Sequence, residues 1–440
     1  MRRSGTRIDG SRRLPGRRRV WERARGEHAF TMIEMIAAIS VFAVLIVGVA
    51  VTMSSSMNLV RNNRNRSVAA NLASQEMDTV RSTEFTDLPV GQTVTVETVD
   101  AVPYTVTRET EWVTQSASAG ACDAPPGSRP AYLRVTVQVT WPNMRGVPPA
   151  SAHTILTPPV GAYDPNSGNI AVKVVGRDGF GQGGVPVSIT GPQSASQVTN
   201  SDGCAFFAFV PAGTYTAGVS APGYVDLQGV ATPTQPASVV VGATTSVQFP
   251  YDRAATLVLS VAGKDLGSPA PATLTVNLYN TYILPSGMQT LPGSGNPRTI
   301  SGKFPFADGY DVWVGDCAEA DPASYSGGSR QTVAVQPAGT SSAVIPVPEI
   351  RIRVQQDLGG GVMAPVPGRE VSAVGCAGAD TFSLGQTDAN GQITFALPFG
   401  TWQILVDGGS LYSGSVLLTP GANPGDGDGT WPYDISVTTT

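Results

Sequence analysis

The sequence predicts an α+β protein in which a long N-terminal transmembrane helix lies on a small antiparallel β head, followed by tandem all-β sandwich domains. First, residues 35–53 contain no charge, and a helix needs about 20 apolar residues to cross a bilayer core. Second, residues 90–160 alternate with the period of two that is typical of strands. Third, the remaining segments are rich in turns and repeat about every 90 residues.

The charge distribution predicts how the chain is oriented in a membrane. Residues 1–29 hold ten Arg and three acidic residues, whereas the rest of the chain holds 18 basic and 30 acidic residues. A basic segment before an apolar run keeps the N-terminus in the cytoplasm, so the acidic body is exported from the cytoplasmic membrane, which the chain crosses once. A nucleic-acid-binding arm would not precede a bilayer-length apolar run, and we find no direct indication of nucleic-acid binding.

The helix is expected to span residues 30–82, with its membrane part at about 35–53. No Pro or Gly interrupts residues 54–82, and apolar residues from Met57 to Val80 recur at spacings typical of one helix face. The segment from Glu84 to Pro89 then ends the helix.

One carboxylate, Glu34, stands at the start of the apolar run. A charge at membrane depth costs roughly 2.5 kcal/mol or more, so it normally has a partner. A cleaved signal peptide is disfavoured because no A-x-A site follows Val51. An uncleaved signal anchor is one alternative, and a helix capping box formed by Thr31 and Glu34 is a local structural explanation of the acid.

The residues around Glu34 resemble the class III signal of type IV pilins and of the pseudopilins of type II secretion. They run Ala29, then Phe30-Thr31-Met32-Ile33-Glu34. The resemblance implies that a prepilin peptidase cleaves between Ala29 and Phe30, removes residues 1–29 as a basic leader, and methylates the new N-terminus at Phe30. It also implies that Glu34 neutralises the α-amino group of a neighbouring subunit during assembly. Ala29 departs from the usual Gly, Val51 replaces a helix-kinking Pro that many major pilins have, and the leader is long.

Residues 83–160 are expected to form the antiparallel β head of four strands. The runs that alternate are 93–99, 104–107, 111–113, 132–141 and 154–156. A segment rich in Pro, Gly and Asn at 158–169 links this head to the rest of the chain.

The body after the head repeats three times. Asp178, Asp265 and Asp357 each follow an apolar strand and are 87 and 92 residues apart. A second landmark, a turn followed by an aromatic residue, occurs at 210–215, at 304–310 in degenerate form, and at 397–402. We therefore predict β sandwiches at 161–251, 252–348 and 349–440. The first and third resemble the carboxypeptidase regulatory-like, transthyretin-like sandwich, which implies a binding or structural module without catalysis.

Composition disfavours an enzyme, a cofactor and a metal site. The chain has two His, His28 and His153, three Lys, and no P-loop or dinucleotide-binding motif. Four cysteines lie on the exported side, where disulfides persist, and are candidates for bonding: Cys122, Cys204, Cys317 and Cys376. They allow three pairings that the sequence does not distinguish, and one of these, Cys317 with Cys376, would join the second and third sandwiches. Buried free thiols are the alternative.

The sequence thus favours a minor pilin or pseudopilin-type subunit of a type IV pilus or type II secretion-like filament. The expected partners are a prepilin peptidase, other pilin or pseudopilin subunits and the membrane, and the sandwiches would bind an unspecified surface ligand or protein outside the cell. The alternative is a membrane-anchored surface adhesin that never polymerises.

Overall fold

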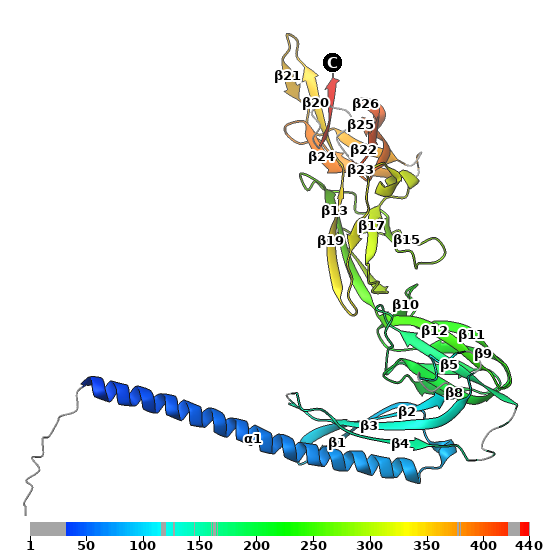
Figure 1. The fold of residues 1–440 in the computed structure, drawn as a ribbon. Coiled ribbons are helices and arrows are strands. Elements are labelled where there is room, and N and C mark those ends of the chain that lie inside the picture. Colours follow the sequence, from blue (N-terminus) through cyan, green and yellow to red (C-terminus); the bar gives the residue numbers. More distant parts are fainter. Residues whose placement is uncertain are drawn as a thin grey trace, which may run out of the picture. The chain divides into compact units, whose positions relative to one another are not determined.

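The computed structural model describes residues 32–440 except 116–119, 126–127, 145, 160, 162–163, 165, 376–377, 379, 421–431 and 440. The described chain consists of one long apolar helix followed by many small, mainly antiparallel sheets, which confirms the predicted α+β class (Figure 1). It divides into two compact units between Asn65 and Arg66, and each unit is described separately below.

The first unit contains most of helix α1 (Met32–Ser82). Its residues from Met32 to Met57 are exposed and mainly apolar on all sides, including Phe42 and Leu45. A helix that is apolar all round needs a bilayer or other helices to cover it. The helix is long and apolar enough to cross a membrane.

In the second unit, the end of α1 packs on the four-stranded head sheet. Ala69, Ala73, Met77 and Val80 recur every three or four residues and are buried against alternate residues of the third strand. The helix ends at Ser82, and the 3-10 turn η1 (Phe85–Asp87) follows.

All strand pairs of the head are antiparallel and neighbours in sequence order. The strands are β1 (Gly91–Val99), β2 (Val102–Thr114), β3 (Pro130–Thr140) and β4 (Ala150–Leu156). The runs predicted at 104–107 and 111–113 belong to a single strand, β2, because Arg108 to Thr110 pair with both neighbouring strands.

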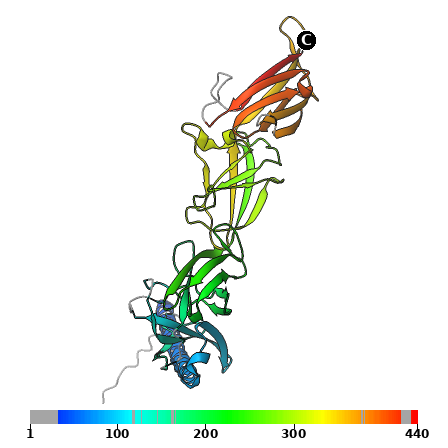
Figure 2. The ribbon, with the colours of Figure 1, turned by 90° about the vertical axis from the view of Figure 1, so that its right-hand side faces the viewer.

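The rest of the second unit repeats one seven-strand arrangement three times. In one sheet the first strand lies between the fourth strand, which is antiparallel to it, and the last strand, which is parallel to it. In the facing sheet the order is third, second, fifth, sixth. Each described strand pairs only within its own copy, and the colours of Figure 2 run through the three copies in sequence order from green to red.

The strand bounds of the first sandwich are β5 (Ser167–Val175), β6 (Pro186–Thr190), β7 (Ala195–Val198), β8 (Cys204–Pro211), β9 (Gly213–Val219), β11 (Thr234–Val239) and β12 (Thr244–Arg253), with a short additional β10 (Tyr224–Asp226). Those of the second are β13 (Ala255–Gly263), β14 (Val276–Tyr279), β15 (Met288–Leu291), β16 (Arg298–Lys303), β17 (Tyr310–Val314), β18 (Gln331–Val333) and β19 (Thr340–Val347), with 3-10 turns η2 (Ala318–Ala320) and η3 (Pro322–Ser324). Those of the third are β20 (Glu349–Asp357), β22 (Glu370–Gly375), β23 (Asp380–Gln386), β24 (Gln392–Ala396), β25 (Gly400–Val406), β26 (Tyr412–Leu418) and β27 (Tyr433–Thr439), with β21 (Met363–Pro365) and η5 (Asp407–Gly409).

The aromatic residue of each repeated turn enters a sandwich core. Tyr215, Tyr310 and Trp402 are buried. Each donates a hydrogen bond to a carbonyl oxygen shortly before it in the chain: Tyr215 Oη to Pro211 at 3.0 Å, Tyr310 Oη to Phe304 at 2.8 Å and Trp402 Nε1 to Pro398 at 2.9 Å. Burial raises the pKa of Tyr310 well above its usual range. The degenerate middle copy therefore places its aromatic residue as the other two do. The domain bounds drawn from the sequence stay predictions.

An acidic residue lies beside each of the two short links between consecutive sandwiches. One residue separates β12 from β13 and one separates β19 from β20. At the first link, Arg177 N donates to Asp252 Oδ2 at 2.9 Å. At the second, the carboxylate of Glu349 accepts hydrogen bonds of 2.9–3.3 Å from the backbone N–H groups of Asp265, Leu266 and Ser268. Asp252 thus binds the turn that follows the first strand of its own sandwich, whereas Glu349 binds the corresponding turn of the preceding sandwich.

Candidate functional site

The first candidate site is the beginning of α1. Ala29 and Phe30, between which cleavage is predicted, lie outside the described residues. Glu34 lies in the first turn of the helix, where the helix dipole favours an acid. It is the only charged residue from Met32 to Val60, and Ile33 and Met35 beside it are exposed. This end of the helix therefore offers one negative charge within an apolar surface.

Two hydroxyl groups in the apolar part of the same helix donate hydrogen bonds to backbone carbonyls of that helix. Ser40 Oγ donates to the Ile36 carbonyl at 2.8 Å, and Thr52 Oγ1 donates to that of Val49 at 2.9 Å. A hydroxyl that bonds within its own helix needs no water, so these residues do not oppose burial in lipid or among helices.

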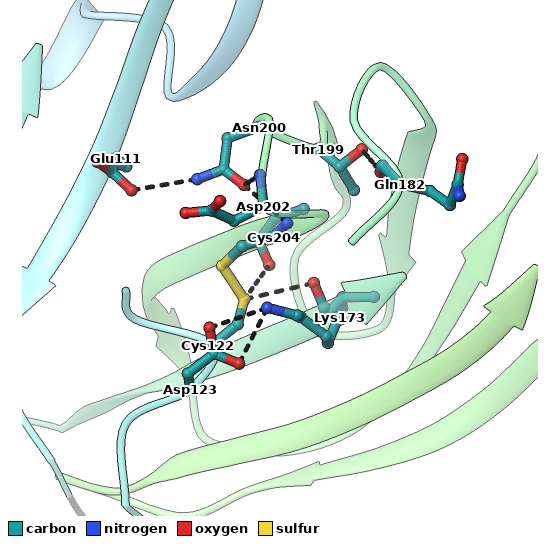
Figure 3. Close-up of a disulfide and its surroundings, with 11 residues drawn as sticks. Glu111, Cys122, Asp123, Lys173, Gln182, Thr199, Asn200, Asp202 and Cys204 are labelled. Atoms are coloured by element: carbon teal, nitrogen blue, oxygen red, sulfur yellow. Dashed lines mark hydrogen bonds and ion pairs between the residues drawn. A yellow bond between two sulfur atoms is a disulfide. The ribbon is translucent and has the colours of Figure 1, made fainter. Parts of the chain in front are cut away.

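The second candidate site is the junction between the head and the first sandwich, which a disulfide closes (Figure 3). Cys122 lies in the loop after β2 and Cys204 begins β8, 82 residues later, with their Cα atoms 5.7 Å apart. Cys317 is also disulfide-bonded, and Cys376 lies outside the described residues. The alternative of free thiols therefore does not apply to Cys122, Cys204 and Cys317.

An ion pair accompanies this disulfide. Lys173 Nζ on β5 lies 2.9 and 2.8 Å from the two carboxylate oxygens of Asp123, the residue after Cys122 (Figure 3). The loop of the head is thus held to the sandwich by one covalent bond and by one ion pair, in which Lys173 is half-buried and Asp123 is exposed.

A polar contact joins the same two domains beside the disulfide. Asn200 Oδ1 accepts hydrogen bonds from the N–H groups of Asp202 and Cys204, which shapes the turn before β8. Its Nδ2 donates to Glu111 Oε2 on β2 at 3.1 Å (Figure 3). Arg134 Nε donates to the other oxygen of Glu111 at 2.7 Å, and this partner raises the pKa of Arg134. The carboxylate of Glu111 is therefore shared between the head and the sandwich.

The third sandwich has the same turn with a different acceptor. Asp388 Oδ1 accepts hydrogen bonds of 2.8 Å from the N–H groups of Asn390 and Gln392, which lower the pKa of the Asp388 carboxyl. Asp388 is exposed, whereas Asn200 faces a carboxylate. The amide at position 200 is therefore the feature that lets this turn approach Glu111.

Glu34 and the cysteines are predicted from the sequence, whereas Glu111, Asn200 and Asp123 are not. The available signal is that Asn200 stands where the aligned turn of the third sandwich has Asp388. Neither candidate site joins a nucleophile to a base. In the part of the chain that the structure describes, no group of three or more His, Cys, Asp and Glu side chains could hold a metal ion.

Comparison with known proteins identifies the N-terminal segment. Residues 24–50 match the family described as the prokaryotic N-terminal methylation motif, which implies processing by a prepilin peptidase. No curated protein matches the chain.

Among solved structures, the chain is similar to the Bacillus anthracis TIE protein, with 11% identity over 80% of this chain and 73% of that one, and a TM-score of 0.20. It is similar to GBS52, the minor pilin of Streptococcus agalactiae, with 14% identity over 41% and 95% and a TM-score of 0.19. It is also similar to BcpA, the major pilin subunit of Bacillus cereus, with 11% identity over 62% and 99% and a TM-score of 0.19.

Proposed function

We propose that this chain is a minor pilin or pseudopilin-type subunit of a type IV pilus or type II secretion-like filament. A prepilin peptidase would cleave between Ala29 and Phe30 and methylate Phe30. The observation that carries the proposal is the methylation motif at 24–50, which includes the start of a helix whose apolar surface is exposed on every side. In a filament, the helices of other subunits would cover that surface.

Glu34 has a specific role in this proposal. Burial of its carboxylate among apolar helices is costly unless an opposite charge accompanies it. Cleavage after Ala29 creates an α-amino group four residues before Glu34, and an adjoining subunit would supply that group to the carboxylate. Packing of helices and pairing of charges would then favour the same arrangement.

The size of the sandwiches favours a subunit that occurs rarely in the filament rather than one that repeats along it. About 270 residues follow the head, and so large a body on every subunit would crowd a helical array. We therefore place the chain at a tip or among infrequent subunits, with its sandwiches displayed for binding to a surface or a partner.

Processing is tested first. The chain is expressed in a membrane with and without a prepilin peptidase, and the N-terminus is determined by mass spectrometry. The proposal expects a methylated phenylalanine from residue 30. An N-terminus that still begins at Met1 in the presence of an active peptidase would instead support the membrane-anchored adhesin that does not polymerise.

Assembly is tested with Glu34→Ala. This variant should still be cleaved but should remain in the membrane fraction, with at least a tenfold loss from sheared filaments, measured by immunoblot. Ser40→Ala, on the same helix, is the control and should enter filaments normally. Equal amounts of Glu34→Ala and wild type in filaments would contradict the assigned role.

A further inference from the structure

A cleft of about 400 Å³ lies where the first and second sandwiches meet. Leu227, from the turn after β10, contributes one wall. Ile283 and Leu284, from the segment between β14 and β15, and Met288, the first residue of β15, contribute the other. Its volume is within the range of small-molecule sites, which are mostly apolar with a few placed polar groups. The cleft is therefore suited to a small ligand with an apolar body.

Hydrogen bonds join the two walls. Gln228 Nε2 donates to the Tyr282 carbonyl at 3.1 Å, and the Leu284 N–H donates to Gln228 Oε1 at 3.0 Å. Val225, from β10 of the first sandwich, belongs to the core cluster of the second. The cleft is thus formed without a ligand.

One buried cation faces this cleft. Lys303, the last residue of β16, is 9% exposed and its side chain lines the cleft. Its Nζ donates to Gln289 Oε1 at 2.5 Å. Among the described residues no carboxylate lies within ion-pair distance of Lys303.

This environment disfavours the charged lysine. A neutral amide does not compensate for the loss of water around an ammonium group, and burial lowers the pKa of Lys303. An ammonium has three N–H donors, and Gln289 accepts from one of them. An anion in the cleft would supply the missing charge and accept further hydrogen bonds.

We propose that this cleft is a binding site for a small organic carboxylate, whose anionic group pairs with Lys303 while its apolar body contacts Leu227, Ile283 and Met288. Lys303 excludes cationic ligands, and the apolar walls disfavour polyols. This site goes beyond filament assembly and does not depend on it, because residues 227–310 take no part in processing or helix packing.

The three lysines of the chain allow a direct test. Full-length protein in detergent is labelled with ¹³C-lysine, which gives one set of side-chain NMR signals for each of Lys173, Lys264 and Lys303. Benzoate is titrated at constant pH and ionic strength, and benzamide, its neutral counterpart of the same shape, is titrated in parallel. Benzoate should shift the Lys303 signals saturably and leave the other two lysines in place. Benzamide should produce no saturable shift.

Variants then separate charge from shape. Lys303→Met keeps an apolar side chain of similar length and should weaken benzoate binding at least tenfold, followed through the methyl signal of Met288. Lys264→Met is the matched control and should bind as wild type does, and Lys303→Arg should retain saturable binding. Three results would overturn the proposal: benzoate does not shift the Lys303 signals, benzoate shifts the Lys264 signals equally, or benzamide binds as tightly as benzoate. The wild-type titrations decide the matter even where Lys303→Met does not fold.

Discussion

At the scale of single residues, Asn200 joins two domains because it is an amide. Its oxygen accepts two backbone hydrogen bonds within its own turn, and its nitrogen donates to Glu111. An aspartate could keep the first role but not the second, and it would place a second negative charge beside Glu111.

The substitution Asn200→Asp should therefore destabilise the exported body by about 2 kcal/mol at pH 7, as expected for a buried donor lost and a like charge gained. Urea unfolding at pH 7 measures the difference from wild type. The reverse exchange in the third sandwich, Asp388→Asn, is exposed and should change stability by less than about 0.5 kcal/mol. Equal effects of the two exchanges would contradict this account of the junction.

The sequence predicts the roles of residues that depend on a local pattern, but not of residues that depend on contacts distant in sequence. Tyr215 and Trp402 could be placed because a local turn pattern leads each of them into a strand. Glu349 and Lys303 could not, because their environments are made by residues far from them in sequence. The partners of Glu349 at Asp265 to Ser268 are more than 80 residues away. A local pattern of apolar and polar residues cannot predict contacts between residues so far apart in the sequence.

At the scale of elements, helix α1 and the head strands were largely predictable. The absence of Pro and Gly after residue 53 and the turn signal before Pro89 set the end of the helix at Ser82. The exception is β2, which the sequence divides at Arg108–Thr110, where polar residues interrupt the alternation. Pairing with a strand on each side keeps the backbone of these residues extended.

The disulfide is an element-scale constraint that the sequence left open among three pairings. Because it closes a loop between residues 82 apart, it restricts the unfolded chain substantially. The double substitution Cys122→Ser, Cys204→Ser should lower the free energy of unfolding by about 3 kcal/mol. Urea unfolding measures this, and limited proteolysis should become faster in the loop that contains Cys122. An unchanged unfolding midpoint would show that the ion pair and the Glu111 contacts suffice to hold the junction.

At the scale of the whole molecule, the three sandwiches are joined by one-residue links, and a buried acid binds across the second of these links. Glu349 is fully buried and accepts hydrogen bonds from three backbone N–H groups of the preceding sandwich. The turns in the sequence revealed the repeat, but the sequence did not reveal that Glu349 binds the repeated turn of the preceding sandwich.

Replacing Glu349 by Ala should destabilise the second and third sandwiches by about 3 kcal/mol, because the three donors lose a charged acceptor in a buried site. Glu349→Gln keeps one carbonyl oxygen and should lose roughly half as much. Glu370→Ala, at an exposed position of the same sandwich, serves as the control and should change stability little. Thermal and urea unfolding provide the comparison, and a Glu349→Ala variant as stable as the control would refute the role of this acid.

The parallel pairing of the first and last strands has a mechanical consequence. The chain enters each sandwich at the start of the first strand and leaves at the end of the last one, and these strands lie side by side in the same direction. A pull on the two ends slides one strand along the other, so the hydrogen bonds between them share the load in shear instead of opening one after another. Each sandwich is therefore built to resist tension along the chain, because extension must break this whole ladder at once.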